Sequence, residues 1–222
     1  MPIVTQTNVA SLETQKNLFR SQAALQKSFS RLSSGHRINS AADDAAGLAI
    51  SESMRTQIRS YVVAERNASD AISMTQTAEG ALGEMHSILG RLRELAMQGS
   101  NGSMTATDRG YLSTEFSALQ AEMTRIQASS KFNGKSLLSA TASSLTFQVG
   151  LNNTASDKVT LTFGGLGLTT LLAATTNLSG AGTTASLTAL GRIDSALATI
   201  STSRARFGAA MNRFEVVTSS IQ

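Results

Sequence analysis

Few residues in this chain have the types and spacing that catalysis or metal binding requires. The 222 residues include no Cys and only two His, His36 and His86, which are far apart in the sequence. Neither His belongs to a His-Glu-x-x-His segment, so the sequence predicts no zinc site. Asp43 and Asp44 are adjacent carboxylates, as acid–base catalysis can use, but a helix start explains them better. We therefore expect no enzyme activity, no metal and no cofactor.

Two further stretches have compositions that suggest a binding role. The glycine-rich segment Gly164-Gly165-Leu166-Gly167 lacks both the Lys of a phosphate-binding loop and the third Gly of a dinucleotide fingerprint, which indicates an ordinary loop. The uncharged stretch 159–191 is interrupted by Thr, Gly and Asn too often for a membrane span. The first residues lack the positively charged region and the apolar region that make up a secretory signal. Any export would therefore use a route without such a signal.

The positive charge of the chain is concentrated at its N-terminus. The net charge of +4 comes from 19 basic and 15 acidic residues. Residues 1–40 hold five basic residues against Glu13 alone, so the other 14 basic and 14 acidic residues cancel. Such a segment could bind nucleic acid or an anionic membrane. The basic residues are four to seven positions apart and no aromatic base-stacking platform accompanies them, so we expect neither partner and interpret the segment as a helical arm facing solvent or another subunit.

Apolar spacing predicts four helices. The arm shows a coiled-coil spacing of 4, 3, 4 and 3 until Ser33-Ser34-Gly35 interrupts it. Ser40 is the expected N-cap of a second helix over about 41–98, with Asp43 and Asp44 in its first turn. The spaced residues of the arm are Leu18, Gln22, Leu25, Phe29 and Leu32, and the apolar positions of the second helix include Ile58, Val62, Leu82, Met85, Leu89 and Leu92.

The second helix contains Gly80, Gly83 and Gly90. Each costs up to about 1 kcal/mol relative to Ala. We expect tertiary packing or a close helix approach to offset this cost.

A third helix follows, with Thr105 or Thr107 and Asp108 as its cap. Its apolar positions are Leu112, Phe116, Leu119, Met123 and Ile126.

The spacing of the apolar residues then changes to the two-residue period of β-strands. Phe132-Asn133-Gly134 predicts a turn. Leu145, Phe147 and Val149 alternate with polar residues, as do Val159, Leu161 and Phe163, which predicts a β-hairpin around Asn152-Asn153. A last helix carries spacings of 3 and 4 up to the end of the chain without a cap, so we expect a shortened polypeptide. Its positions are Leu190, Ile193, Leu197, Ile200, Arg204, Phe207, Met211, Phe214, Thr218 and Ile221.

The predicted fold class is mainly α with a small β element. It is an elongated antiparallel helical bundle or coiled coil, with a β-hairpin region and an N-terminal helical arm. Residues 1–43 form the arm, residues 44–138 and 186–222 the helical core domain, and residues 139–185 the hairpin and a variable outer region. Long apolar stripes without caps are typical of proteins that associate with copies of themselves.

Several long segments resemble bacterial flagellin, the subunit of the flagellar filament. They are Leu32–Ile50, Arg91–Gln98, Phe132–Leu138, Phe147–Gly150, Ile193–Leu197 and Gly208–Phe214. The resemblance implies a secreted structural protein of the extracellular filament. Flagellins continue beyond this chain's last residues to a helix that pairs with the arm. We therefore expect the stripe Leu18, Leu25, Phe29 and Leu32 to lack that partner, and the chain to lack the export-chaperone site.

The resemblance also implies partners. They are other copies in a helical filament, hook-associated and cap proteins, an export chaperone and the host Toll-like receptor 5. The positions that match the receptor-binding core are Arg91, Leu95 and Glu115, and we expect an exposed Leu95 beside Arg91. Two alternatives remain open: a hook-filament junction protein, and a coiled-coil signalling protein of the chemoreceptor type, which would not have the β-hairpin.

Overall fold

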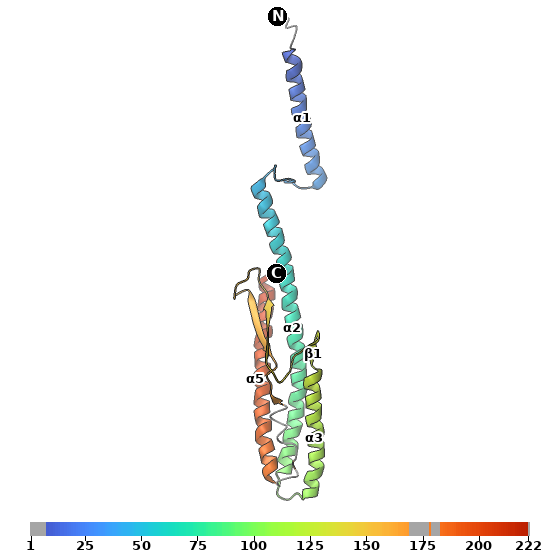
Figure 1. Ribbon diagram of the computed structural model, residues 1–222, viewed down its shortest axis with the longest axis vertical. Coiled ribbons are helices and arrows are strands. Elements are labelled where there is room, and N and C mark those ends of the chain that lie inside the picture. Colours follow the sequence, from blue (N-terminus) through green and yellow to red (C-terminus); the bar gives the residue numbers. More distant parts are fainter. Residues whose placement is uncertain (1–7, 169–177, 179–182, 222) are drawn as a thin grey trace. The chain divides into compact units, whose positions relative to one another are not determined.

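A computed structural model describes residues 8–168, 178 and 183–221 of the chain (Figure 1). The chain divides into two compact units, residues 1–59 and 60–222. The first unit holds helix α1 (Val9–Ser34) and the beginning of α2 (Ala45–Gly99). The second holds the rest of α2, α3 (Ala106–Ser129), the strand pairs β1 (Lys131–Phe132) with β2 (Lys135–Ser136) and β3 (Ser143–Gln148) with β4 (Lys158–Phe163), and α5 (Thr183–Ile221). The predicted mainly α class with a small β element is confirmed.

Local signals set both ends of α1. The side chain of Asn8 accepts a hydrogen bond from the backbone N–H of Ser11 at 3.1 Å, which caps the first turn. Gly35 follows the last turn with a φ of +67°, a left-handed conformation that favours glycine. The predicted helical arm is therefore present. None of its residues is buried.

The predicted N-cap of α2 is wrong. Ser40 begins a turn, in which the Asp43 N–H donates to the Ser40 carbonyl at 3.0 Å, and the helix starts at Ala45. Asp44 caps it instead, because its Oδ1 accepts the Gly47 N–H at 2.9 Å. A Cβ at Gly47 would lie 2.5 Å from Asp44 Oδ2 and 2.9 Å from Ile38 Cδ1, so any larger residue there requires the capping carboxylate and Ile38 to shift.

The buried side of α2 lies in its later part. Leu82, Met85, Leu89 and Leu92 are fully buried, as predicted. Ile58 and Val62, which are also apolar positions of the helix, are exposed over 62% and 44% of their surface, so the apolar row leaves the core at the start of α2.

The glycines of α2 differ from prediction too. An added Cβ at Gly80, Gly83 or Gly90 would meet nothing within 4 Å, so no close approach offsets these residues. The close approach of another helix occurs at Gly99 instead, where an added Cβ would lie 2.8 Å from Ser186 Oγ of α5.

The start of α3 is a capping box of Thr105 and Asp108, so of the two predicted caps, Thr105 and Thr107, the first is confirmed. The Asp108 N–H donates to Thr105 Oγ1 at 3.2 Å, and the Thr105 N–H donates to Asp108 Oδ2 at 3.1 Å. Phe116 and Met123 are buried, and the other predicted apolar positions of α3 pack beside the core.

Two antiparallel hairpins follow α3. The predicted turn at Asn133 and Gly134 joins β1 to β2, and both residues have positive φ, +47° and +77°, as two-residue hairpin turns require. In the larger hairpin, Leu145 pairs with Leu161 and Phe147 with Val159, which confirms the predicted pairing of alternating strands.

Helix α5 packs on the larger hairpin and on α2 (Figure 1). The Phe207 ring lies 5.3 Å from that of Phe163, and the Phe214 ring 5.5 Å from that of Phe147, in an edge-on arrangement. Of the predicted apolar positions of α5, Ile193, Ile200, Phe207 and Phe214 are buried. The other buried residues of this helix face are smaller than the predicted Leu side chains. Leu190 and Leu197 lie at the edge of the core, and the buried companions are Ala189, Ala196 and Ala210. Residues 169–177 and 179–182 of the predicted variable outer region lie outside the described residues.

Candidate assembly and recognition surfaces

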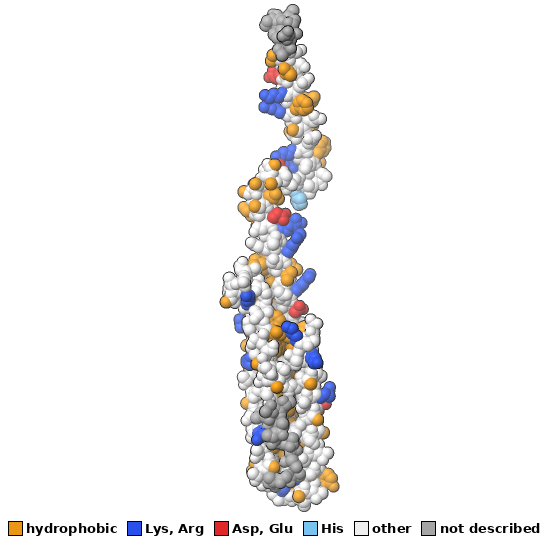
Figure 2. All heavy atoms as spheres, viewed as in Figure 1, with side chains coloured by type: hydrophobic (Ala, Val, Ile, Leu, Met, Phe, Trp, Pro, Cys, Tyr) orange, Lys and Arg blue, Asp and Glu red, His pale blue; other side chains and the backbone are white. Residues whose placement is uncertain are grey.

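The predicted stripe of the arm is open to solvent. Exposed fractions are 66% for Leu18, 56% for Leu25, 65% for Phe29 and 81% for Leu32, large values for such apolar side chains. Hydrophobic side chains line this helix in Figure 2. We name Leu18, Leu25, Phe29 and Leu32 the arm stripe. An apolar row of this kind marks an interaction surface.

Sequence reasoning missed a second exposed row at the start of α2. Ile50, Met54 and Ile58 follow at intervals of four residues and are 61%, 57% and 62% exposed. This spacing places them on one helix face. The same periodicity that revealed the arm stripe could have found this row, of which the sequence analysis named Ile58 alone as an apolar position of the helix.

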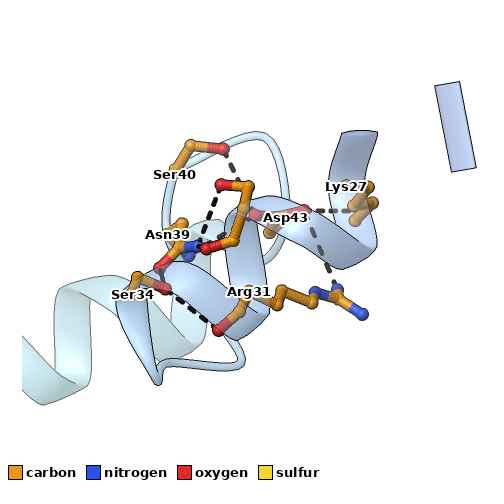
Figure 3. A network of polar contacts seen from close by, with 7 residues as sticks. Lys27, Arg31, Ser34, Asn39, Ser40 and Asp43 are labelled. Atoms are coloured by element: carbon orange, nitrogen blue, oxygen red, sulfur yellow. Dashed lines mark hydrogen bonds and ion pairs between the residues drawn. The ribbon is translucent and has the colours of Figure 1, made fainter. Parts of the chain in front are cut away.

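Asp43 joins the loop 35–44 to α1, as the dashed lines in Figure 3 show. Its Oδ1 lies 2.6 Å from Lys27 Nζ and 3.8 Å from Arg31 Nη2. Its Oδ2 accepts from the Asn39 N–H at 3.4 Å and from Ser40 Oγ at 3.5 Å. The hydrogen bond from Lys27 lowers the pKa of Asp43 below its ordinary value, against a smaller opposing effect of burial. The carboxylate is therefore charged at neutral pH.

Asn39 adds a second contact between the loop and the end of α1. Its Nδ2 donates to the Ser30 carbonyl at 3.0 Å, and its Oδ1 accepts from Ser34 Oγ at 2.8 Å. Ser34 Oγ also accepts the His36 N–H at 3.2 Å, so the turn around Gly35 is hydrogen-bonded on both sides. His36 is thus part of a helix end. Within the described ranges, no three His, Asp or Glu side chains gather as a metal site would need.

The predicted receptor-recognition residues divide into a surface pair and a core residue. Arg91 Nε donates to Glu115 Oε1 at 2.8 Å, which joins α2 to α3, and Arg91 Nη1 donates to Glu94 at 2.9 Å. The hydrogen bond to Glu115, followed by that to Glu94, raises the pKa of Arg91 above its ordinary value. Both Arg91 and Glu115 are about half exposed, at 50% and 44% of their side-chain surface.

Leu95 does not belong to that surface. Only 1% of it is exposed, so the expected exposed Leu beside Arg91 is wrong. Leu95 follows the buried Leu92 by three residues, which puts it on the core side of the helix. It packs in the hydrophobic core on the same helix as Arg91.

The other stretches considered have structural explanations. Gly164 and Gly165 both have φ of +72°, and a Cβ on Gly164 would lie 2.6 Å from the Thr141 carbonyl oxygen, so the glycines allow a close loop packing. Among the described helices, none has a segment apolar and long enough to span a membrane.

The fold and these surfaces define a class of protein: a helical structural protein with rows of exposed apolar side chains. Comparison with known proteins makes the class specific. The family model of the bacterial flagellin N-terminal helical region matches residues 5–143, and the chain belongs to the bacterial flagellin family.

Curated relatives agree with this assignment. The chain is 50% identical to the B-type flagellin of Pseudomonas aeruginosa over 152 residues, which are 68% of the chain and 31% of the relative. It is 46% identical to flagellin A of Vibrio anguillarum over 69% of the chain and 40% of the relative. A flagellin of Halalkalibacterium halodurans is 41% identical over 94% of the chain and 76% of the relative. The chain thus spans well under half of the first two relatives.

Solved structures show the same fold. The crystal structure of Bacillus cereus flagellin has a TM-score of 0.61 at 32% identity and covers 71% of this chain and 89% of that one. A putative flagellar hook-associated protein from Vibrio parahaemolyticus has a TM-score of 0.68 at 15% identity, covering 82% and 94%. At that identity the second likeness concerns the fold alone.

Proposed function

We propose that this protein is a structural subunit of the bacterial flagellar filament, exported and polymerised outside the cell for motility. The supporting observation is that the arm stripe of this flagellin-family chain is exposed to solvent along one face of α1. Its partners would be other copies of the protein and hook-associated and cap proteins. The proposal involves no catalytic step.

Exposed apolar rows explain how such a chain would assemble. The arm stripe and the row Ile50, Met54 and Ile58 lie in the first unit, where no side chain of residues 8–59 is buried. Burying apolar surface contributes about 25 cal/mol per Å², so covering these rows favours association. When the rotation between neighbouring subunits does not close a ring, the contacts generate an open helical filament.

Co-assembly tests the proposal. An epitope-tagged form of the chain is mixed with the Pseudomonas B-type flagellin, polymerised with salt and viewed by electron microscopy with gold-labelled antibody. We expect label along the filaments. Phe29→Ser, which changes the arm stripe, should reduce incorporation, whereas Gln26→Ser, at an exposed polar position of the same helix, should leave it unchanged.

The alternative role as a hook-filament junction protein predicts a different picture. The likeness to a hook-associated protein keeps this alternative open. Label confined to filament ends would favour it, and label absent from filaments and ends alike would contradict the filament proposal. A chemoreceptor-type signalling protein has less support, because the β-hairpin and the flagellin relatives both oppose it.

We further propose that the host Toll-like receptor 5 binds the surface formed by Arg91 and Glu115. The pair is half exposed, bridges two helices and presents a guanidinium, a side chain enriched at binding hot spots. Leu95 enters this proposal only as the buried support beneath Arg91.

A pull-down with the receptor ectodomain tests the receptor proposal. Arg91→Ala should weaken binding, while Arg125→Ala should not. Arg125 makes a matched control because it is exposed on α3 and pairs with Glu122 one turn away. Circular dichroism should show unchanged helicity for both variants. Equal binding by Arg91→Ala and the unmodified protein would contradict the assignment.

A further inference from the structure

Two Asn-Gly dipeptides lie in turns of the second unit. Asn101-Gly102 belongs to the connection from α2 to α3, and Asn133-Gly134 joins β1 to β2. All four residues are exposed. In an Asn-Gly dipeptide the backbone nitrogen can attack the asparagine side chain easily, because glycine has no Cβ to shield that nitrogen. Residue type and exposure therefore do not distinguish the two dipeptides.

The turn at Asn101 brings the reacting groups together. The Asn101 Oδ1 accepts a hydrogen bond from the Ser103 N–H at 3.1 Å, which closes an Asx turn around Gly102. This turn holds the Asn101 Cγ beside the Gly102 nitrogen. The same hydrogen bond polarises the side-chain amide at the oxygen where negative charge develops when Cγ is attacked. Among the described residues, no carbonyl accepts the Gly102 N–H, so this nitrogen is not held elsewhere.

The turn at Asn133 has a different geometry. Asn133 and Gly134 have φ of +47° and +77°, and the pairing of Phe132 with Lys135 holds this turn on both sides. Its backbone is therefore restrained from rotating toward the asparagine side chain. Within the described residues, no N–H donates to the Asn133 side chain in the way that Ser103 donates to that of Asn101.

We propose that Asn101 is a site of spontaneous deamidation, at which the chain modifies itself without an enzyme. The Gly102 nitrogen forms a bond to Asn101 Cγ, and the side-chain Nδ2 leaves as ammonia with the proton of that nitrogen. The product is a cyclic imide, which water then opens. Addition of water at Cγ gives aspartate, and addition at the backbone carbonyl gives isoaspartate. Water is the only other reactant, and no group is oxidised or reduced.

The reaction changes the turn that Arg109 contacts. Arg109 Nη2 donates to the Asn101 carbonyl at 3.5 Å and to the Met104 carbonyl at 2.8 Å. Both products place a new carboxylate in this turn, and isoaspartate also lengthens its backbone by a methylene group. The modification thus accumulates with the age of the protein at the connection between α2 and α3. It does not depend on the proposed filament function.

Mass spectrometry of the ageing protein tests the proposal. The whole chain is kept at mildly alkaline pH and body temperature, and samples are digested with trypsin. The peptides 94–109 and 132–135 each contain a single Asn, so the two sites are measured separately. In the folded protein we expect Asn101 to deamidate roughly tenfold faster than Asn133, because correct positioning of reacting groups has effects of at least this size. In urea the two rates should converge, since both turns are lost.

Gly102→Ala is the matched variant. An added Cβ at Gly102 meets nothing within 4 Å, so the fold accepts alanine while the Cβ shields the attacking nitrogen. This variant should slow deamidation at Asn101 several-fold and leave Asn133 unchanged. Equal rates at the two sites of the folded protein, or a faster rate at Asn133, would overturn the proposal, as would an Asn101 rate that Gly102→Ala leaves unchanged. A difference between the sites that persists in urea would also overturn it, because the turn would not be its cause.

Discussion

Buried polar side chains have structural roles that their residue types alone do not reveal. Arg109 is 8% exposed and has three carbonyl oxygens as partners rather than a carboxylate. Its Nε donates to Gly99 at 3.2 Å, and its Nη2 to Asn101 at 3.5 Å and Met104 at 2.8 Å. These carbonyls belong to the end of α2 and the turn before α3. Arg109 therefore fixes the connection between the two helices that carry Arg91 and Glu115.

Arg109→Ala should lower the free energy of unfolding by about 2 to 3 kcal/mol, because hydrogen bonds to a charged group are lost and the buried carbonyl of Gly99 is left unpaired. Urea unfolding followed by circular dichroism measures this change. Arg125→Ala is the control, with no measurable change expected because both partners of its ion pair are exposed. An Arg109→Ala protein as stable as the unmodified one would show that water replaces the guanidinium without cost.

At the scale of elements, replacing two glycines of α2 by alanine should change the free energy of unfolding in opposite directions. At Gly90 an added Cβ meets nothing within 4 Å, so Gly90→Ala should raise the free energy of unfolding by up to about 1 kcal/mol. At Gly99 the Cβ would lie 2.8 Å from Ser186 Oγ of α5, so Gly99→Ala should destabilise the protein. Thermal unfolding of both variants tests the pair. Stabilisation by Gly99→Ala would mean that α2 and α5 can separate at this end without cost.

The cap of α3 should make stability depend on pH. Hydrogen bonds from the Thr105 hydroxyl and then its backbone N–H lower the pKa of Asp108 below the ordinary 3.8. A carboxyl with a lowered folded-state pKa contributes its full stabilisation above its unfolded pKa. That contribution is lost as the pH falls through the folded pKa. Urea unfolding of the unmodified protein and Asp108→Asn should therefore differ at pH 7 and converge toward pH 2. If the difference in unfolding free energy between the two proteins did not change with pH, the charged cap could not be its source.

The sequence predicts elements well where periodicity and local capping agree. The hairpin, the capping box at Thr105 and the buried residues of α3 and α5 all follow from spacing. Spacing does not reveal that Ile58 and Val62 are exposed, because it shows that a row of apolar residues exists, not which neighbour covers it. The exposure expected of Leu95 came from the resemblance, whereas its spacing from the buried Leu92 places it on the core side of the helix. Side-chain choice at a cap also depends on backbone geometry: Ser40 and Asp44 are both good caps by type, and only the turn at Ser40 decides between them.

At the scale of the whole molecule, the two units differ in how they hold their side chains. The second unit has a continuous buried cluster that includes α2, α3, the larger hairpin and α5. The first unit, over its described residues 8–59, has no buried side chain and relies on helix caps and the contacts of Asp43 and Asn39. Local opening should therefore cost much less free energy in residues 8–59 than in the second unit.

Limited trypsin digestion should cut the first unit before the second. The expected early sites are Lys16, Arg20, Lys27, Arg31 and Arg37, and the late ones include Arg93 and Arg109. Phe214→Ala provides the control, because loss of a buried ring that packs on Phe147 costs about 3 to 5 kcal/mol. It should speed the late cuts and leave the early ones unchanged. Mass spectrometry of the time course measures both, and early cleavage at Arg93 or Arg109 in the unmodified protein would contradict this order of stability.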